Sequence, residues 1–151
     1  MIDLKPKKCN LCGGTVIYTS NAKIYYGKEY GSGKCYLCLN CRAYVGTHKP
    51  RPDEALGILA NAEMREWKIK CHDLFDKLWQ SEPQDEKRGS RYYRNKYYRI
   101  LAVELGVEKE VCHFGYFDLD MLKRAYEVLS TKNLKTIKRA KNHERKNKYV
   151  K

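Results

Sequence analysis

The chain lacks any run of 18 apolar residues, so no stretch of it is expected to cross a bilayer as a helix. Its first residues, Met-Ile-Asp-Leu-Lys-Pro-Lys-Lys, also lack the apolar segment of a secretory signal peptide. We therefore expect a cytoplasmic protein with no membrane partner. Reducing conditions there argue against disulfides among the seven cysteines and favour metal ligation by four of them.

Acidic residues are scarce, with 18 against 31 basic residues and a net charge of +13. The imbalance is greatest in residues 132–151, where nine basic residues face Glu144 alone and account for +8 of the total. A basic excess favours polyanionic partners through counterion release. A lysine-rich tail is equally typical of a solvated, disordered end, so the sequence leaves open whether this tail is disordered or a helical extension.

The sequence contains two close cysteine pairs, Cys9-x2-Cys12 and Cys38-x2-Cys41. Two thiolates separated by two residues can hold one side of a tetrahedral Zn²⁺, and a second pair completes the site. The 25 residues between the pairs are a natural length for two strands and a turn. We predict a zinc ribbon over residues 1–48. Because all four ligands would be cysteine, we expect one structural zinc ion.

Cys35 makes the second pair ambiguous, because Cys35-x2-Cys38 has the same spacing. We favour Cys38 and Cys41, which lie between an entering and a leaving strand, as the first pair does. Cys35 would then be a small apolar residue on the entering strand. Spacing alone leaves both alternatives open, along with reduced structural cysteines that bind no metal.

The remaining sequence predicts an α+β protein with about three helices packed on the ribbon. Expected strands cover residues 15–19, 24–26, 34–38 and 43–46. Expected helices run from an Asn61 cap to Trp79, from Arg91 under a Ser90 cap to Leu105, and from an Asp118 cap through Leu129. The helical part is predicted to span residues 53–131, after an extended, proline-containing connector.

Residues 87–99 combine basic and aromatic side chains without an acidic residue. Arginine suits phosphates and exposed tyrosine can stack on bases. Tyr93 and Tyr97 fall on the predicted core face, which leaves Tyr92 and Tyr98 as candidates for stacking. The candidate nucleic-acid-binding residues of this segment and of the tail are Arg88, Arg91, Arg94, Lys96, Arg99, Lys138, Arg139, Lys141, Arg145 and Lys146. An ordinary solvated helix face explains the same pattern.

Several segments in one order resemble the zinc-finger-containing domain family of bacterial and phage proteins, whose function is largely uncharacterised. The segments that carry the resemblance are Cys9–Gly14, Cys38–His48, Leu56–Arg65, Cys71–Trp79, Tyr97–Ala102 with Leu105–Val107, and Cys112–Asp118. The resemblance covers residues 9 to about 129. It implies zinc ligation by Cys9, Cys12, Cys38 and Cys41, with Cys35 as an extra, and frequent occurrence in phages and mobile elements. It brings no reaction.

His48, His72 and His113 each lie within one of these segments, and Asp76 follows His72 by one helical turn. If the fold brought all four together, they could bind a second metal or act as acid and base in a nuclease-like site. We favour a structural role, in which these histidines form buried hydrogen bonds, because their spacing matches no known catalytic motif.

Three hypotheses follow from the sequence. The first is a small, non-enzymatic protein of phage or mobile-element type that binds nucleic acid mainly through phosphates. The second is a phage-encoded inhibitor that binds a host protein, such as an enzyme of defence or nucleic-acid metabolism; either would act in the host cytoplasm. The third is a metal-dependent nuclease.

Overall fold

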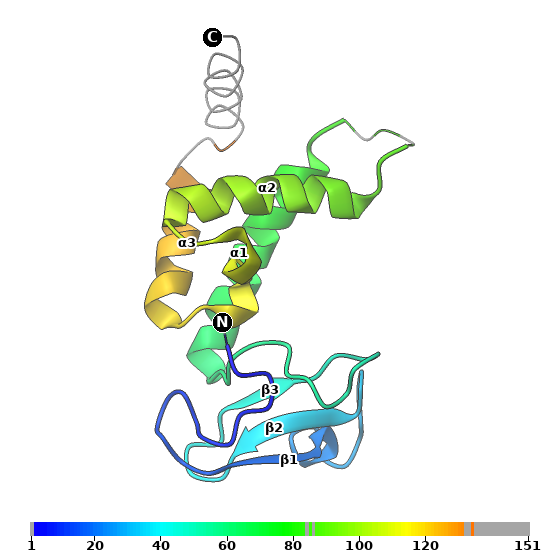
Figure 1. Ribbon diagram of the computed structural model, residues 1–151, viewed down its shortest axis with the longest axis vertical. Helices are drawn as coiled ribbons and strands as arrows, with labels where there is room; N and C mark the ends of the chain where they lie inside the picture. The colour runs from blue at the N-terminus through cyan, green and yellow to red at the C-terminus, as the bar shows by residue number, and fades with distance from the viewer. Residues whose placement is uncertain (1, 84, 86, 132–133, 135–151) are drawn as a thin grey trace. The chain divides into compact units, whose positions relative to one another are not determined.

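The computed structural model describes residues 2–83, 85, 87–131 and 134 (Figure 1). The chain divides into two compact units. The first consists of the described residues up to Glu66 together with Gly115–Leu119, and the second of the described residues in Trp67–Phe114 and from Asp120 onward. The first unit holds a three-stranded antiparallel sheet and the second most of the helical residues, which confirms the predicted α+β class.

The sheet of the first unit has the order β1-β2-β3, with β1 at Val16–Ser20, β2 at Lys34–Cys38 and β3 at Tyr44–Gly46. The central strand β2 is buried at four of its five positions, so its side chains form the middle of a small core. In the β1–β2 register Tyr18 lies opposite Tyr36, and their ring centroids are 5.2 Å apart. One hydrophobic cluster in the core of this unit consists of Cys9, Val16, Tyr36, Cys38, Ala43, Val45, Ala55 and Leu59.

The segment after β3 returns along the sheet instead of leaving it. Thr47 forms a bridge with Ala55, and Tyr44 forms one with Ala60. The extended connector predicted for residues 48–52 is therefore a turn-rich segment of the first unit, which continues beyond the residue where the sequence placed the end of the ribbon.

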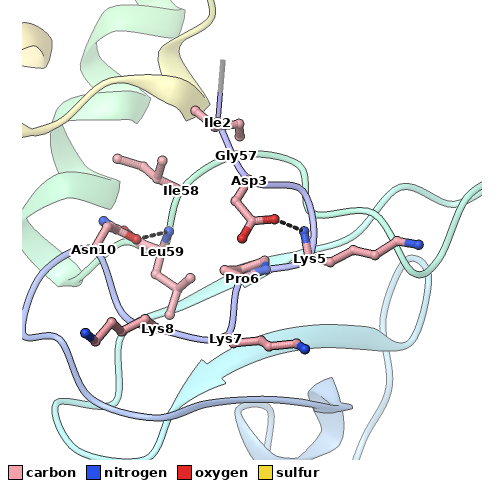
Figure 2. Close-up of a pocket in the computed structure, with 10 residues that line it drawn as sticks. All are labelled: Ile2, Asp3, Lys5, Pro6, Lys7, Lys8, Asn10, Gly57, Ile58 and Leu59. Atoms are coloured by element: carbon pink, nitrogen blue, oxygen red, sulfur yellow. Dashed lines mark hydrogen bonds between the residues drawn. The ribbon is translucent and has the colours of Figure 1, made fainter.

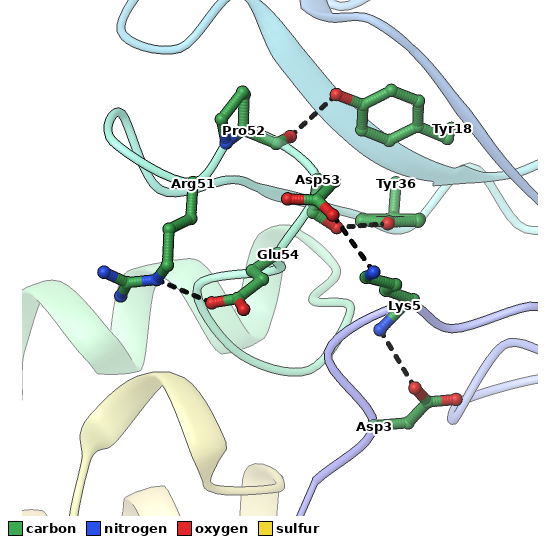
Figure 3. A network of polar contacts seen from close by, with 8 residues as sticks. All are labelled: Asp3, Lys5, Tyr18, Tyr36, Arg51, Pro52, Asp53 and Glu54. Atoms are coloured by element: carbon green, nitrogen blue, oxygen red, sulfur yellow. Dashed lines mark hydrogen bonds and ion pairs between the residues drawn. The ribbon is translucent and has the colours of Figure 1, made fainter.

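Tyrosine hydroxyls from the sheet hold this returning segment in place (Figure 3). Tyr18 donates to the carbonyl oxygen of Pro52 at 2.7 Å, and Tyr36 donates to that of Asp53 at 2.6 Å. The Asp53 carboxylate also pairs with Lys5 at 3.0 Å. Because both members of that ion pair are well exposed, we assign most of the stabilisation to the tyrosine hydrogen bonds.

A second attachment joins the first cysteine pair to residues 57–59 (Figure 2). The Asn10 amide accepts a hydrogen bond from the backbone N–H of Leu59 and donates one to its carbonyl oxygen, at 2.9 and 3.0 Å. Next to it, Gly57 lies so close to Gly115 that an added Cβ would overlap the Gly115 carbonyl oxygen. Gly115 also accepts a hydrogen bond from the Ile58 N–H at 2.9 Å. Only glycine fits this backbone contact at position 57.

The strand predicted at residues 24–26 is wrong. After β1 the chain forms a 3-10 helix, Asn21–Lys23, and then a tight turn, visible in Figure 1 as the blue helical turn following β1. The Ser20 hydroxyl caps this helix by accepting from the Ala22 N–H at 3.1 Å. Tyr26 and Gly27 both have positive φ, which a strand does not allow. The β propensity of the Ile-Tyr-Tyr sequence is therefore overridden by local capping and turn formation.

The three predicted helices are present, as α1 (Ala62–Gln80), α2 (Ser90–Leu105) and α3 (Leu119–Thr131). Asn61 caps α1, as predicted, by accepting a hydrogen bond from the Met64 N–H at 2.9 Å. The α2 cap differs from the prediction. Gly89 occupies the N-cap position without a side-chain hydrogen bond, so Ser90 is the first helical residue. Among the described helices none is long and apolar enough to cross a membrane.

The core of the second unit is rich in aromatic side chains. Phe75 of α1 stacks on Tyr98 of α2 with centroids 4.2 Å apart, and both rings contact Phe114. The buried Cys71 thiol donates to the Leu122 carbonyl oxygen at 3.4 Å, which links α1 to α3. Burial also raises the pKa of Tyr98 to about 12, since desolvation disfavours the phenolate. Tyr98, which the sequence left uncertain, is therefore a packing residue.

Candidate metal centre

The four cysteines of the two close pairs converge at one end of the sheet of the first unit. The Sγ atoms of Cys9 and Cys41 are 3.7 Å apart, and those of Cys12 and Cys38 are 3.4 Å apart. All four sulfur atoms lie within 4.8 Å of one another. Sulfur atoms placed 2.3 Å from a tetrahedral zinc ion are separated by about 3.8 Å. The four sulfurs are therefore already positioned to bind one zinc ion.

The two pairs have matching backbone turns. The Gly13 N–H donates to the Cys9 carbonyl oxygen at 2.9 Å, and the Arg42 N–H donates to that of Cys38 at 3.1 Å. Both turns require a positive φ directly after the second cysteine, 75° at Gly13 and 68° at Arg42. Glycine adopts this conformation without strain, whereas arginine has to bring its Cβ close to the following carbonyl.

These turns direct backbone N–H groups at the sulfur atoms of the cysteines. The Leu11 and Gly14 N–H groups donate to the sulfurs of Cys9 and Cys12, each at 3.3 Å. The Asn40 N–H donates to Cys38 in the same way at 3.4 Å. Such hydrogen bonds stabilise thiolates and orient them toward a metal.

The Asn40 side chain is a contact that sequence reasoning missed. Its amide nitrogen donates to the Cys12 sulfur at 3.4 Å and so links the second cysteine pair to the first. This bond, followed by that of Gly14, lowers the pKa of Cys12 to about 6. Its only sequence signal is its position inside the second pair, which does not reveal that the side chain turns toward the sulfur.

The pKa of Cys41 is shifted in the opposite direction to that of Cys12. Hydrogen bonding from the Ala43 backbone favours its thiolate, but desolvation and the sulfurs of Cys12 and Cys9 outweigh it and raise the pKa of Cys41 to about 12. Four adjacent thiolates repel one another, so they cannot all ionise without a cation. Zinc removes this repulsion and would be held by all four sulfurs. With no position left for water, its contribution is to hold the two turns together.

Gly14 shows how closely the surrounding chain fits this cluster. A Cβ at this position would lie 2.7 Å from the Asn40 Cβ and 3.1 Å from the sulfurs of Cys12 and Cys38. A side chain there would push the two cysteine pairs apart. Gly14 is therefore required by close approach, whereas Gly13 is required by its backbone conformation.

A closed four-cysteine site on a three-stranded antiparallel sheet defines a zinc-ribbon protein. The chain belongs to the zinc-finger-containing domain family, whose family model matches residues 5–132. Searches of curated proteins and of solved structures gave no significant match.

Cys35 is not part of the metal cluster. It lies in the middle of the sheet on β2, opposite Thr19 on one side and Gly46 on the other, and its side chain is buried. Desolvation raises the pKa of its thiol above the usual value, so Cys35 is a neutral thiol that fills space in the core.

The histidine candidates are divided between the two units. His48 belongs to the first, and its backbone N–H donates to the Glu54 carbonyl oxygen at 3.0 Å. His72, Asp76 and His113 belong to the second. Within the described residues, the four cysteines are the only group of three or more potential metal ligands whose ligand atoms lie together.

His72 and His113 have aromatic neighbours. The His72 ring packs edge-to-face on Phe114 with centroids 4.8 Å apart, and the His113 ring lies 5.8 Å from that of Tyr98. Both side chains remain partly exposed, yet this packing desolvates each ring enough to lower its pKa below the usual histidine value. The rings of His72 and His113 therefore take part in aromatic packing, and the structural role expected for these histidines stays a prediction.

The basic residues of α2 fall into two groups. Arg91, Arg94 and Arg99, which we call the exposed arginines of α2, are open to solvent, whereas Lys96 is mostly covered. Lys96 pairs with Glu82 at 2.9 Å, so its charge is already compensated inside the fold. Arg88, just before the helix, lies over the exposed Tyr92 ring. The tail candidates, Lys138, Arg139, Lys141, Arg145 and Lys146, lie outside the described residues.

A pocket of about 360 Å³ lies on the first unit beside the attachment made by Asn10 (Figure 2). Ile2, Pro6 and Ile58 contribute apolar surface to it, and three lysines, at positions 5, 7 and 8, also line it. The Asn10 amide and the Lys5 ammonium already have partners within the fold.

Proposed function

We propose that this zinc-ribbon protein binds nucleic acid, mainly through its phosphates, and catalyses no reaction. The observation that carries the proposal is the set of exposed arginines of α2, in a helix with no acidic residue before Glu104. Arginine presents a planar fork of donors that suits phosphate oxygens, and it stays charged at every physiological pH.

The position of Arg91 at the N-terminus of α2 also favours phosphate binding. The first turn of α2 contains Arg91 and no acidic residue, although the positive end of the helix dipole lies there. Stability alone would favour aspartate or glutamate at such a place. A cationic first turn instead produces a concentrated positive potential, which attracts a polyanion.

As part of the same proposal, we suggest that the protein acts in a host cytoplasm, which its resemblance to phage and mobile-element proteins favours. Phosphates carry no sequence information, so we expect weak sequence selectivity. The zinc site would hold the first unit together and take no part in contacts with the bases.

Fluorescence anisotropy of labelled DNA and RNA over a salt series tests the proposal. The logarithm of the binding constant should fall linearly with the logarithm of salt concentration, by about 0.9 per phosphate contact on duplex DNA. Replacing the three exposed arginines by glutamine should reduce this slope by about 2 to 3. Lys96→Gln is the matched comparison and should change the slope by much less, because Glu82 already neutralises Lys96.

The basic tail makes a separate contribution in this proposal. Deleting residues 132–151 should flatten the salt slope further, and an unchanged slope would remove the tail from the interface. If no nucleic acid bound at physiological salt, the proposal would be wrong. A protein complex that survives nuclease treatment would then favour the host-protein inhibitor.

A further inference from the structure

The loop between β1 and β2, residues 21–33, contains an exposed tyrosine with a strained backbone conformation. Tyr26 has φ = 55°, in the left-handed region, and its side chain is fully exposed at 101%. Among the described residues, Tyr26 and Arg42 are the only non-glycine residues with positive φ. A bulky L-residue in this region is strained, because its Cβ crowds the following carbonyl.

The turn itself explains the conformation but not the choice of residue. The Gly27 N–H donates to the Ala22 carbonyl oxygen at 2.8 Å, which closes the turn and requires a left-handed residue near its end. Glycine or asparagine would adopt that conformation more easily. With its whole side chain in solvent, Tyr26 gains no packing in return. Strain without a structural benefit indicates a functional residue.

The loop that carries Tyr26 is firmly held. The buried Asn21 side chain donates to the Tyr30 carbonyl oxygen at 2.7 Å and accepts from the Tyr30 N–H at 3.2 Å. The Ser20 hydroxyl donates to the Glu29 carboxylate at 2.7 Å. The tyrosine is therefore displayed on a preorganised turn, so a ligand would not have to order the loop first.

The surroundings of Tyr26 are aromatic and basic. Tyr25 and Tyr30 of the same loop are exposed and meet edge-to-face, with ring centroids 5.0 Å apart. The Lys28 ammonium lies 5.5 Å from the Tyr30 ring centroid. Lys23 lies at the end of the 3-10 helix and Lys34 begins β2, so the segment 21–34 carries three lysines and one acidic residue, the serine-bonded Glu29.

We propose that residues 21–34 form a stacking platform for unpaired bases, with Tyr26 as the principal contact, and that the preferred ligand is single-stranded nucleic acid. The inference rests on the proposed function and specifies its ligand. Tyrosine rings stack on bases of any sequence, and lysines follow the adjoining phosphates. A duplex hides its base faces in the helical stack, so it can use the lysines but not Tyr26.

Anisotropy with a single-stranded oligonucleotide and with a duplex of the same sequence and length tests this platform, using the full chain loaded with zinc. Tyr26→Asn should weaken single-strand binding roughly 5- to 100-fold, as loss of one stacked base does. It should leave duplex binding within about twofold and the salt slope unchanged, because no charge is removed. Tyr26→Trp should retain single-strand binding, since its larger ring also stacks.

Two controls separate stacking from damage to the fold. Asparagine tolerates the left-handed conformation, so the thermal midpoint of Tyr26→Asn should equal or exceed that of the parent protein. Leu56→Asn removes another exposed apolar side chain of the first unit and should leave both affinities unchanged.

The outcomes distinguish the platform from the broader function. If single strands and duplexes bind with a steep salt slope and Tyr26→Asn changes neither, the platform is wrong while phosphate-driven binding stands. Equal weakening toward both ligands would also overturn it, because the contact would not be stacking. If the parent protein binds neither ligand at physiological salt, both proposals fail together.

Discussion

The residues after the second cysteine of each pair illustrate how a single backbone angle sets stability. Gly13 and Arg42 occupy equivalent positions with nearly equal φ values, 75° and 68°. No atom lies within 4 Å of a Cβ built on Gly13, so a substitution there would add backbone strain without a steric clash. Comparison of Gly13 with Arg42 therefore separates the effect of backbone conformation on stability from the effect of packing.

Two substitutions of opposite sign test this contribution. Gly13→Ala should destabilise the zinc-loaded protein by about 1 kcal/mol, because alanine is strained in the left-handed region. Arg42→Gly should stabilise it by roughly 0.5 kcal/mol, since relief of strain exceeds the added freedom of the unfolded chain. Urea unfolding measures both. The same sign for the two changes would contradict the argument.

At the scale of elements, the first unit depends on contacts between segments that are distant in sequence. Leu59 is hydrogen-bonded to Asn10, which lies between the first pair of cysteines. Two residues earlier, Gly57 packs closely against Gly115. The contact between Gly57 and Gly115 joins two backbone segments, so it is sensitive to an added methyl group.

Gly57→Ala should destabilise the protein by about 2 to 3 kcal/mol, because the new Cβ overlaps the Gly115 carbonyl and forces the backbones apart. Gly46→Ala is the matched control. Its Cβ would meet only a Leu56 methyl carbon at 3.5 Å, an ordinary contact, so stability should change little. Thermal or urea unfolding compares the two variants. Equal effects would show that the close approach at Gly57 does not limit stability.

At the scale of the whole molecule, zinc and helices belong to different units. All four cysteines of the metal cluster lie in the first unit, whereas α2, most of α1 and most of α3 lie in the second. The first unit has a small core, and two of the eight residues of its hydrophobic cluster, Cys9 and Cys38, belong to the metal site. Small domains of this kind commonly obtain much of their stability from the metal.

Removal of zinc by a chelator should therefore unfold the first unit and preserve most of the helical circular dichroism. Amide hydrogen exchange should become fast in β1–β3 while α2 and the Phe75–Tyr98 core stay protected. Readdition of zinc should restore protection. Simultaneous loss of the helical signal would show that the two units fold as one cooperative system.

The metal cluster and the positions of the helices could be predicted from the sequence, because they depend on patterns of residues that are close along the chain. The spacing of Cys9-x2-Cys12 and Cys38-x2-Cys41 identified the metal cluster, because two residues are the separation that lets both thiolates reach one ion. The Asn61 cap of α1 and the core face of α2 with Tyr93 and Tyr97 were predicted correctly, since both depend on residues that are close in sequence. The structural role expected for His48, His72 and His113 stays a prediction.

Only the tertiary structure decided features that depend on distant partners. Cys35 and Cys41 have the same spacing from Cys38, and their roles separate because pairing with Thr19 and Gly46 places Cys35 inside the sheet. The sequence around Tyr26 has the β propensity of a strand, yet the Ser20 cap, the Gly27–Ala22 hydrogen bond and the Asn21–Tyr30 contacts together make it a turn. Sequence pattern specifies what a residue can do, and three-dimensional packing selects which of those possibilities its neighbours allow.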